Sequence, residues 1–155
     1  MNEKIVELLN DQINKELYSA YLYLDMAVFY DELDLDGYCN YYTIQAQEER
    51  DHAMMFLKYM QDNDLKVTLK AIDKPDKVFE NVIDPLLVAK EHEHYVTSLI
   101  NNIYHEAYQA KDYRTMKFLD WFVSEQMEEE DAAGTMISRY KRFGQDPKGL
   151  YLLDQ

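Results

Sequence analysis

A glutamate and a histidine three residues apart, Glu49 and His52, lie in a segment without proline or glycine. On a helix they share one face and can offer a carboxylate and an imidazole to a transition metal. The motif alone is weak, because an exposed Glu/His pair is common. Helical steps through this segment trace one apolar stripe that contains Glu49: Tyr42, Ala46, Glu49, Ala53, Phe56 and Met60. A buried carboxylate is costly unless it is paired or bound to a cation, so we expect Glu49 to face other polar groups.

Three further helical stripes are each interrupted near their middle by side chains that can bind a metal. The helix that contains Glu49 is predicted over about 38–62. Glu16 interrupts the stripe of a helix over about 2–31, and Glu93 interrupts that of a helix over about 79–110. Gln126 and Glu129 interrupt the stripe of a helix over about 113–143. Four unpaired carboxylates in one core would repel one another and raise one another's pKa values. Bound cations relieve this repulsion, and carboxylates with one imidazole suit iron or manganese. The alternative is a buried hydrogen-bond network.

The connection between the second and third predicted helices reads as extended chain. Leu65, Val67 and Leu69 alternate with polar residues, and Pro75 follows. The roughly 13 residues from 65 to 77 can span roughly 43 Å, and a helix of about 26 residues is roughly 39 Å long. This connection can therefore travel the whole bundle, which would make the second and third helices parallel. The turn-like residues 34–37 and 111–112 predict antiparallel neighbours, and Pro85 should mark a beginning or bend of the third helix. The expected fold is an all-α four-helix bundle with one long crossover.

Length, composition and charge restrict the class of protein. The 155 residues suit one domain, 1–155, and 47% are hydrophobic with only 4 Gly and 3 Pro, which favours long helices. A net charge of −14 argues against a nucleic-acid or anionic-membrane partner and is compatible with cation handling, although solubility alone is an alternative. The single cysteine, Cys39, excludes an intrachain disulfide framework. Without a secretory apolar region or a run of about 18 apolar residues, we expect a cytoplasmic protein.

Three segments resemble those of prokaryotic non-haem ferritins, which belong to the ferritin-like di-iron superfamily. They are Asn-Lys-Glu-Leu-Tyr-Ser at 14–19, Gln-Glu-Glu-Arg-Asp-His at 47–52 and Trp-Phe-Val-Ser-Glu-Gln-Met-Glu-Glu-Glu at 121–130. The similarity covers nearly the whole chain and includes Gly-Leu-Tyr at 149–151. The generic di-iron bundle has two Glu-x-x-His motifs, whereas this chain has Gln126-x-x-Glu129, which resembles ferritins rather than bacterioferritins. No haem is therefore expected. The C-terminal segment is short for the family, so a truncated fifth helix is one expectation.

The resemblance implies a ligand set for iron. Glu16, Glu49 and His52 would bind one ion, and Glu49 would bridge to a second ion held by Glu93 and Glu129, with Gln126 in or beside this shell. Tyr23 resembles the tyrosine found next to the ferritin centre, and ordinary core packing is an equal alternative for it. A third iron site is expected from acidic residues next to Glu129: Glu48, Glu125 and Glu128. A solvated acidic face is the alternative for these three.

The resemblance also implies an activity and an assembly. The expected function is iron storage with ferroxidase activity: Fe²⁺ is oxidised by O₂ or H₂O₂ at the di-iron centre and stored as a ferric oxyhydroxide mineral. Storage needs a cavity, so we expect a homo-oligomer, a hollow shell of 24 subunits. One alternative is a di-iron peroxidase or oxygenase of the same fold that stores nothing, which the lack of a Cys-x-x-Cys metal knuckle weakens. Another is a binding module in which the metals only brace the bundle.

Overall fold

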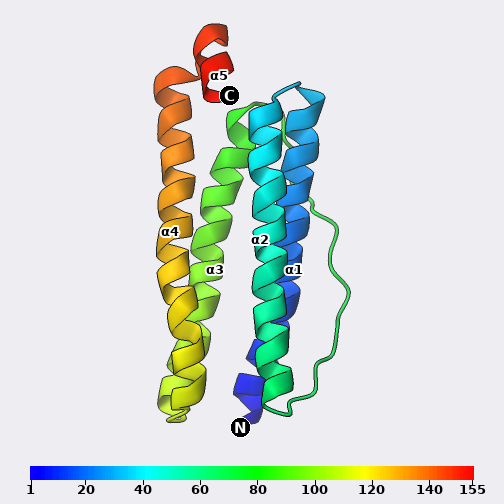
Figure 1. The fold of residues 1–155 in the computed structure, drawn as a ribbon, viewed down its shortest axis with the longest axis vertical. Helices are drawn as coiled ribbons and strands as arrows, with labels where there is room; N and C mark the ends of the chain where they lie inside the picture. The colour runs from blue at the N-terminus through cyan, green and yellow to red at the C-terminus, as the bar shows by residue number, and fades with distance from the viewer.

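Five helices and no strands make up the protein in the computed structural model, which describes residues 1–155. In chain order they are α1 (Glu3–Glu32), α2 (Asp36–Asp62), α3 (Ile83–Gln109), α4 (Tyr113–Phe143) and α5 (Pro147–Leu153). Figure 1 shows α1 beside α2, α3 beside α4, and the link from α2 to α3 running along the outside of the bundle. The predicted all-α bundle with one long crossover is confirmed, and α2 and α3 are parallel.

Short links join the antiparallel neighbours because their residues adopt turn conformations. Asp34, between α1 and α2, and Lys111, between α3 and α4, both have a φ of 58°, the left-handed conformation that often ends a helix. The side chain of Asp112 then accepts a hydrogen bond from the backbone N–H of Thr115 and caps the start of α4. The links at 34–37 and 111–112 are therefore as tight as the sequence predicted, although α2 begins at Asp36 rather than near residue 38.

The start of α3 lies later than predicted, at Ile83 rather than near residue 79. The carboxylate of Asp84 accepts hydrogen bonds from the backbone N–H groups of Glu80 and Asn81, which holds these residues in a turn before the helix. Pro85 stands in the first turn of α3, where its missing N–H costs nothing. The prediction that the helix begins close to Pro85 is confirmed.

The crossover is extended, as predicted, and polar contacts attach it to α1. The side chain of Asn10 donates to the carbonyl of Thr68 at 3.0 Å and accepts from its N–H at 2.9 Å. Lys70 donates to Asp11 at 2.7 Å. At the other end of the bundle, the short α5 is held by Asp154, whose carboxylate accepts from the backbone N–H of Tyr38 at 3.0 Å. No helix is long and apolar enough to cross a membrane.

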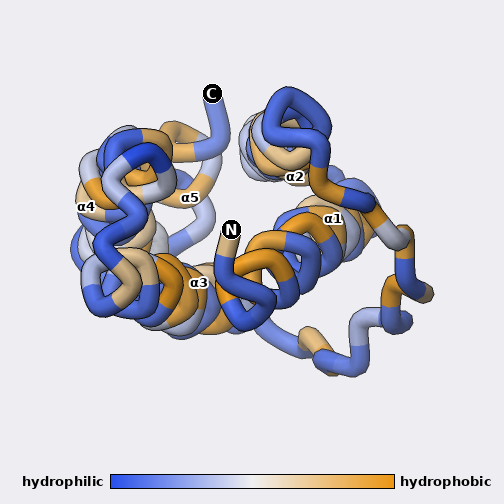
Figure 2. The backbone as a smooth tube through the Cα atoms, turned by 90° about the horizontal axis from the view of Figure 1, so that it is seen from below, coloured by the Kyte–Doolittle hydropathy of each residue, from blue (hydrophilic) through white to orange (hydrophobic).

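Two apolar clusters fill the bundle and leave a polar layer between them. The cluster nearer the N-terminus of α1 is aliphatic and Phe-rich, with Ile5, Leu9, Phe56, Ile100 and Phe122 among its members. The cluster at the opposite end is rich in tyrosine, with Tyr23, Tyr30, Tyr38 and Tyr42. Figure 2 looks along the bundle and shows hydrophobic and hydrophilic segments alternating around each long helix. All four long helices contribute to the polar layer at mid-height.

Candidate metal centre

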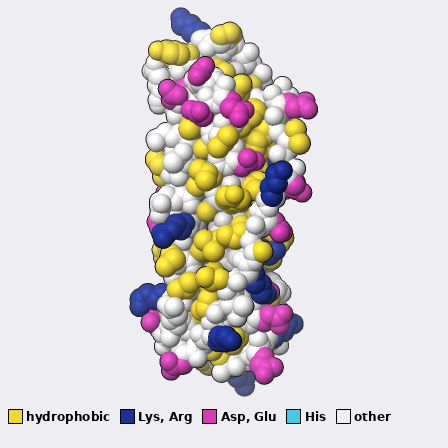
Figure 3. Space-filling view, turned by 90° about the vertical axis from the view of Figure 1, so that its right-hand side faces the viewer, with side chains coloured by type: hydrophobic (Ala, Val, Ile, Leu, Met, Phe, Trp, Pro, Cys, Tyr) yellow, Lys and Arg dark blue, Asp and Glu magenta, His cyan; other side chains and the backbone are white.

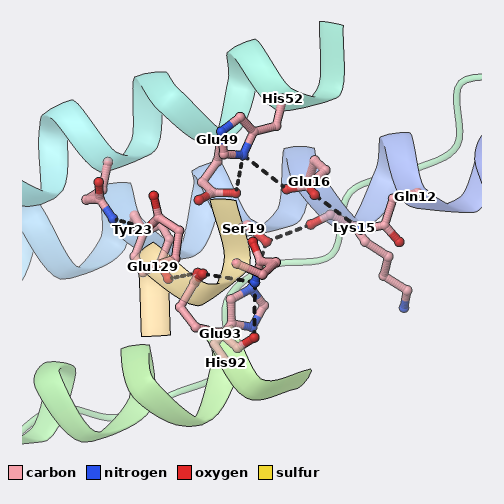
Figure 4. Close-up of polar contacts among 12 residues, drawn as sticks. Gln12, Lys15, Glu16, Ser19, Tyr23, Glu49, His52, His92, Glu93 and Glu129 are labelled. Atoms are coloured by element: carbon pink, nitrogen blue, oxygen red, sulfur yellow. Dashed lines mark hydrogen bonds and ion pairs between the residues drawn. The ribbon is translucent and has the colours of Figure 1, made fainter. Parts of the chain in front are cut away.

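Six buried polar side chains occupy this layer, and none is more than 7% exposed. They are Glu16 from α1, Glu49 and His52 from α2, Glu93 from α3, and Gln126 and Glu129 from α4. Each lies on the inward face of its helix because it continues the apolar series on that helix. Figure 4 shows the four carboxylates and His52 converging from different helices. The helical period thus brings together every residue that the sequence predicted for a di-iron centre.

The acidic and histidine residues of the layer form two compact sets. In the first set, ligand atoms of Glu16, Glu49 and His52 lie within 4.8 Å of one another. In the second set, carboxylate oxygens of Glu49, Glu93 and Glu129 satisfy the same limit. His52 Nδ1 lies 3.4 Å from Glu49 Oε2 and 3.9 Å from Glu16 Oε2. Glu49 belongs to both sets, so its two oxygens are placed to reach two cations at once.

Burial disfavours the ionised form of these four carboxyl groups in the absence of a cation and so raises their pKa values. Burial first, and then the charge of Glu49, raises the pKa of Glu16 well above its usual value. Burial likewise raises the pKa of Glu49 well above its usual value, and the charges of Glu93 and Glu129 add to this. The pKa values of Glu93 and Glu129 are each raised to about 7, chiefly by burial. A cation would offset the desolvation of all four groups.

Two buried carboxylate oxygens in the centre, Glu16 Oε2 and Glu49 Oε1, have no hydrogen-bond donor when both groups are ionised. Unpartnered buried polar atoms are rare in proteins and need an explanation. Glu16 Oε2 lies 3.9 Å from the imidazole of His52, whereas the oxygen of Glu49 that faces this imidazole is Oε2. The unpartnered Oε1 is the other oxygen of Glu49, the residue that belongs to both sets. Hard oxygen donors with one imidazole match the ligands that Fe²⁺, Mn²⁺ or Zn²⁺ accept. The donor chemistry therefore fits a divalent cation once both carboxyl groups are ionised, whereas a proton shared between Glu16 and Glu49 would join them by a hydrogen bond.

The second set differs because its carboxylates already have donors. Tyr23 donates its hydroxyl hydrogen to Glu93 Oε1. Gln126 Nε2 lies 3.4 Å from Glu93 Oε2, and Gln45 Nε2 donates to Glu129 Oε2 at 2.9 Å. Tyr23, which the sequence singled out, is therefore more than a packing residue, since its hydroxyl holds a candidate ligand.

Two glutamines around the centre were missed as candidates by sequence reasoning. Gln45 is one, and the other is Gln12, whose Nε2 donates to Glu16 Oε1 at 3.2 Å. Gln12 stands one helical turn before Glu16 on the same buried face, which is a signal that the sequence does contain. Gln45 stands four residues before Glu49, but on a half-buried position, so its spacing alone gives no warning.

A further histidine, His92, lies beside the centre without joining either ligand set. Its Nε2 is 2.7 Å from Ser19 Oγ, and Figure 4 shows this pair beside Glu93. Burial, followed by the nearby charges of Lys77 and Lys15, lowers the pKa of His92 to about 4. The imidazole is therefore neutral at physiological pH and serves as a hydrogen-bonding group.

The three acidic residues expected to form a third site are only partly brought together. Glu48 and Glu125 are half-buried, whereas Glu128 is exposed. The pKa of Glu48 is raised by burial first and by the charge of Glu125 among other causes, and that of Glu129 is raised in part by a hydrogen bond with Glu125. Glu125 is thus close to both Glu48 and Glu129, although Glu48 and Glu125 lie outside the two compact sets. The third site stays a prediction.

The fold and the layer together define a ferritin-like four-helix bundle with two adjacent carboxylate sets. The family model described as the ferritin-like domain matches residues 6–143. The chain therefore belongs to the ferritin family, and its resemblance to prokaryotic non-haem ferritins is confirmed.

Individual relatives support this assignment along the whole chain. A bacterial non-heme ferritin of Campylobacter jejuni is 39% identical over 155 residues, which are 100% of this chain and 93% of that protein. One from Staphylococcus aureus is 34% identical with the same coverage. Among solved structures, an open-pore ferritin from the archaeon Archaeoglobus fulgidus has a TM-score of 0.97 and 39% identity, covering 99% of this chain and 95% of that one.

Proposed function

We propose that the protein stores iron and oxidises Fe²⁺ to Fe³⁺ at the buried layer. The observation that carries this proposal is the pair of compact ligand sets sharing Glu49, with two buried carboxylate oxygens left without a partner. Family membership supports the substrate, because the relatives are named as ferritins. Two Fe²⁺ ions carry four positive charges, which four ionised carboxylates would balance.

The residues of the centre have distinct tasks in this reaction. Glu16 and His52 hold one ion, Glu93 and Glu129 hold the other, and Glu49 keeps the two close together. Each ion loses one electron, and the pair reduces O₂ with two protons to H₂O₂, or H₂O₂ with two protons to two waters. Carboxylate ligands favour the product because Fe³⁺ gains more than Fe²⁺ from negative charge. Since Glu93 and Glu129 have pKa values of about 7, iron binding near neutral pH should release protons from them.

Storage requires self-association, and one long face of the protein suits it. Figure 3 shows hydrophobic side chains along most of the side where Figure 1 places α1, α2 and the crossover. Residues of α1 and α2 line a shallow apolar groove there, in which Tyr21 is 50% and Leu24 45% exposed. Exposed apolar side chains gathered on one face are typical of protein interfaces. A homo-oligomer follows, and the hollow shell of 24 subunits is the form that the family resemblance implies.

We also retain the third iron site in the proposal, at Glu48, Glu125 and Glu129 with Glu128 at its exposed edge. The closeness of Glu48 and Glu125, seen in their effects on neighbouring pKa values, supports it. Its role would be to receive iron from the pair and change the ratio of Fe²⁺ to O₂ consumed. A Glu125→Ala/Glu128→Ala variant should retain fast oxidation and two ions per subunit with a changed ratio. Wild-type protein that never binds more than two ions per subunit would remove the third site.

Anaerobic titration with Fe²⁺, followed by crystallography, tests the centre most directly. It should show two ions per subunit, with Glu49 contacting both. Analytical ultracentrifugation at neutral pH tests storage, because a shell has a mass of several hundred kilodaltons. A stable monomer or dimer at micromolar concentration would instead support the peroxidase or oxygenase of the same fold. Oxygen consumption on adding Fe²⁺ separates both from a bundle that metals only brace.

A further inference from the structure

A row of polar contacts leads from the second ligand set toward the surface between α3 and α4. Gln126 Nε2 lies 3.1 Å from Thr97 Oγ1. Thr97 Oγ1 lies 2.6 Å from Glu130 Oε2, and Glu130 Oε1 lies 2.7 Å from His94 Nδ1 on the exposed side. Thr97, Glu130 and His94 belong to neither ligand set, so the oxidation chemistry gives them no task.

The direction of each hydrogen bond in this row follows from its end at Glu130. Thr97 Oγ1 lies 2.6 Å from Glu130 Oε2 and 3.0 Å from the backbone carbonyl oxygen of Glu93, and both of these oxygens only accept. The single hydroxyl hydrogen of Thr97 points to Glu130, because that contact is the shorter one and a carboxylate is the stronger acceptor. The lone pairs of Thr97 Oγ1 are then free to accept from Gln126 Nε2. His94 contacts the other oxygen of Glu130 and limits the rotation of its carboxylate. The hydroxyl of Thr97 therefore has one orientation, fixed from outside the metal centre.

This orientation also decides which end of the Gln126 amide faces Glu93. The neighbours of Nε2 are all acceptors: Thr97 Oγ1 at 3.1 Å, the Glu93 carbonyl at 3.2 Å and Glu93 Oε2 at 3.4 Å. A reversed amide would place its oxygen against these three oxygens, which is electrostatically unfavourable. The amide nitrogen is therefore held against the carboxylate of Glu93, and the amide oxygen is turned away from these three oxygens.

We propose that Thr97 and Glu130 are positioning residues, which fix the amide of Gln126 and through it aim the Glu93 carboxylate at the second cation. This rests on the proposed metal centre but goes beyond it, because neither residue touches a cation. Partners outside a ligand set commonly change metal affinity by about 10- to 100-fold when they are removed. The first set, which contains neither Glu93 nor Gln126, should be unaffected.

The test uses anaerobic Co²⁺ titration of the full chain, because Co²⁺ reports each site by its visible absorption without being oxidised. Thr97→Val keeps the shape of threonine and removes the hydroxyl, whereas Thr97→Ser keeps the hydroxyl. Ser98→Ala is the matched control, since Ser98 is exposed and bonds only the carbonyl of Tyr95. Thermal unfolding with a chelator present verifies that each variant is folded.

We expect wild type, Thr97→Ser and Ser98→Ala to bind two Co²⁺ ions with the same spectra. Thr97→Val should bind the first ion normally and the second about ten-fold more weakly with an altered spectrum. Glu130→Gln should also weaken Co²⁺ binding at the second site. Its side-chain amide can donate a hydrogen bond to Thr97 Oγ1, so the hydroxyl hydrogen of Thr97 would turn away from residue 130. If Thr97→Val binds both ions like wild type, the positioning role is refuted while the metal centre stands. If wild type binds no Co²⁺ at this layer, the metal centre itself is refuted.

Discussion

The two candidate ligand sets share Glu49, but they differ in how many hydrogen bonds their other carboxylates accept from the protein before any cation binds. In the first set, Glu16 has one hydrogen-bond donor, Gln12, and an unpartnered oxygen. In the second set, Glu93 accepts hydrogen bonds from Tyr23 and Gln126, and Glu129 accepts one from Gln45. The protein therefore donates more hydrogen bonds of its own to the carboxylates of the second set than to Glu16 in the first set, where a cation would take the place of the missing donor.

This difference has a consequence for binding. A cation in the first set satisfies the unpartnered oxygen of Glu16 and gains an imidazole ligand, so its binding should be tighter for a borderline ion such as Co²⁺ or Fe²⁺. The second set offers three carboxylates and no imidazole, which favours a harder or more highly charged ion. We expect the first set to fill first when Fe²⁺ is added slowly under anaerobic conditions.

The largest effect should come from removing the shared ligand. Glu49→Ala takes a carboxylate from both sets, so we expect no tight ion binding and oxidation of Fe²⁺ at least about 100-fold slower. The metal-free protein should remain folded, because the variant also removes a desolvated charge that repels its neighbours. Stopped-flow absorbance of ferric products measures the rate, and Asp51→Ala, exposed on the same helix, is the control. A folded Glu49→Ala protein with the wild-type rate would contradict the shared role.

Removing the imidazole should separate the two sets. His52→Ala leaves Glu16 and Glu49 with no neutral ligand in the first set, while the second set keeps all its members. We expect Co²⁺ titration to show one tight ion rather than two, and oxidation about 10- to 100-fold slower because a pair of ions is needed. Retention of two equally tight ions in this variant would contradict the role of His52 in the first set, and weakening of both ions would show that the sets are not independent.

The pH dependence of the free energy of unfolding tests whether the buried carboxylates destabilise the metal-free protein when they ionise. The pKa values of Glu93 and Glu129 are about 7 in the folded state, above their ordinary value of 4.5. Between pH 4.5 and about pH 7 the folded state binds more protons than the unfolded state. The contribution of these two groups to the free energy of unfolding therefore falls as pH rises. Each pKa unit corresponds to about 1.4 kcal/mol, and above about pH 7 the loss is complete.

The measurement is thermal unfolding with a chelator at pH 5.5 and pH 8, repeated with Zn²⁺. The metal-free protein should unfold at a lower temperature at pH 8 than at pH 5.5, and Zn²⁺ should stabilise it more at pH 8, where its ligands are ionised. Glu93→Gln should reduce the pH dependence of the metal-free protein. An unchanged pH dependence in Glu93→Gln would contradict this origin.

The sequence predicted that the members of both sets face the core because a helix has a fixed period, whereas their division into two sets was implied by the family resemblance. Glu16, Glu49, Glu93 and Glu129 each continue an apolar stripe, so their inward direction follows without knowledge of the packing. Family membership confirms the fold that brings them to one height, while their service as iron ligands stays a prediction.

The sequence did not predict which side chains donate hydrogen bonds to the carboxylates of the two sets, nor where every helix begins. Gln45 reaches Glu129 across 84 positions of the chain, and the direction of an amide depends on all its neighbours. The late start of α3 has a local cause, the bonds that Asp84 accepts from Glu80 and Asn81, and a tertiary one, because the hydroxyl of Tyr30 donates to the carbonyl of Val82 across 52 positions of the chain. Contacts between distant side chains of this kind are not encoded in a period or a motif.

Tyr23→Phe should have a moderate effect that is confined to the second set. The variant keeps the buried ring, stacked on Tyr42, and removes the hydroxyl that donates to Glu93. A hydrogen bond to a charged group contributes about 1.5–3 kcal/mol, and a bound cation replaces part of this, so the second Co²⁺ ion should bind roughly ten-fold more weakly, the lower end of the range that this energy corresponds to. Weakening of the first ion alone would contradict the assignment of Tyr23 to the second set.

The smallest effects should come from the two glutamines, which provide a matched pair of changes. Gln12→Leu removes the one donor to Glu16, and Gln45→Leu removes the donor to Glu129. A bound cation replaces much of the lost stabilisation, so we expect Co²⁺ affinity to change only about three-fold in each case. The site affected should differ: the first ion for Gln12→Leu and the second for Gln45→Leu. Because both variants lose the same chemical group, equal weakening of both ions in each would show that the two sets behave as one coupled charge cluster rather than as two differently compensated halves.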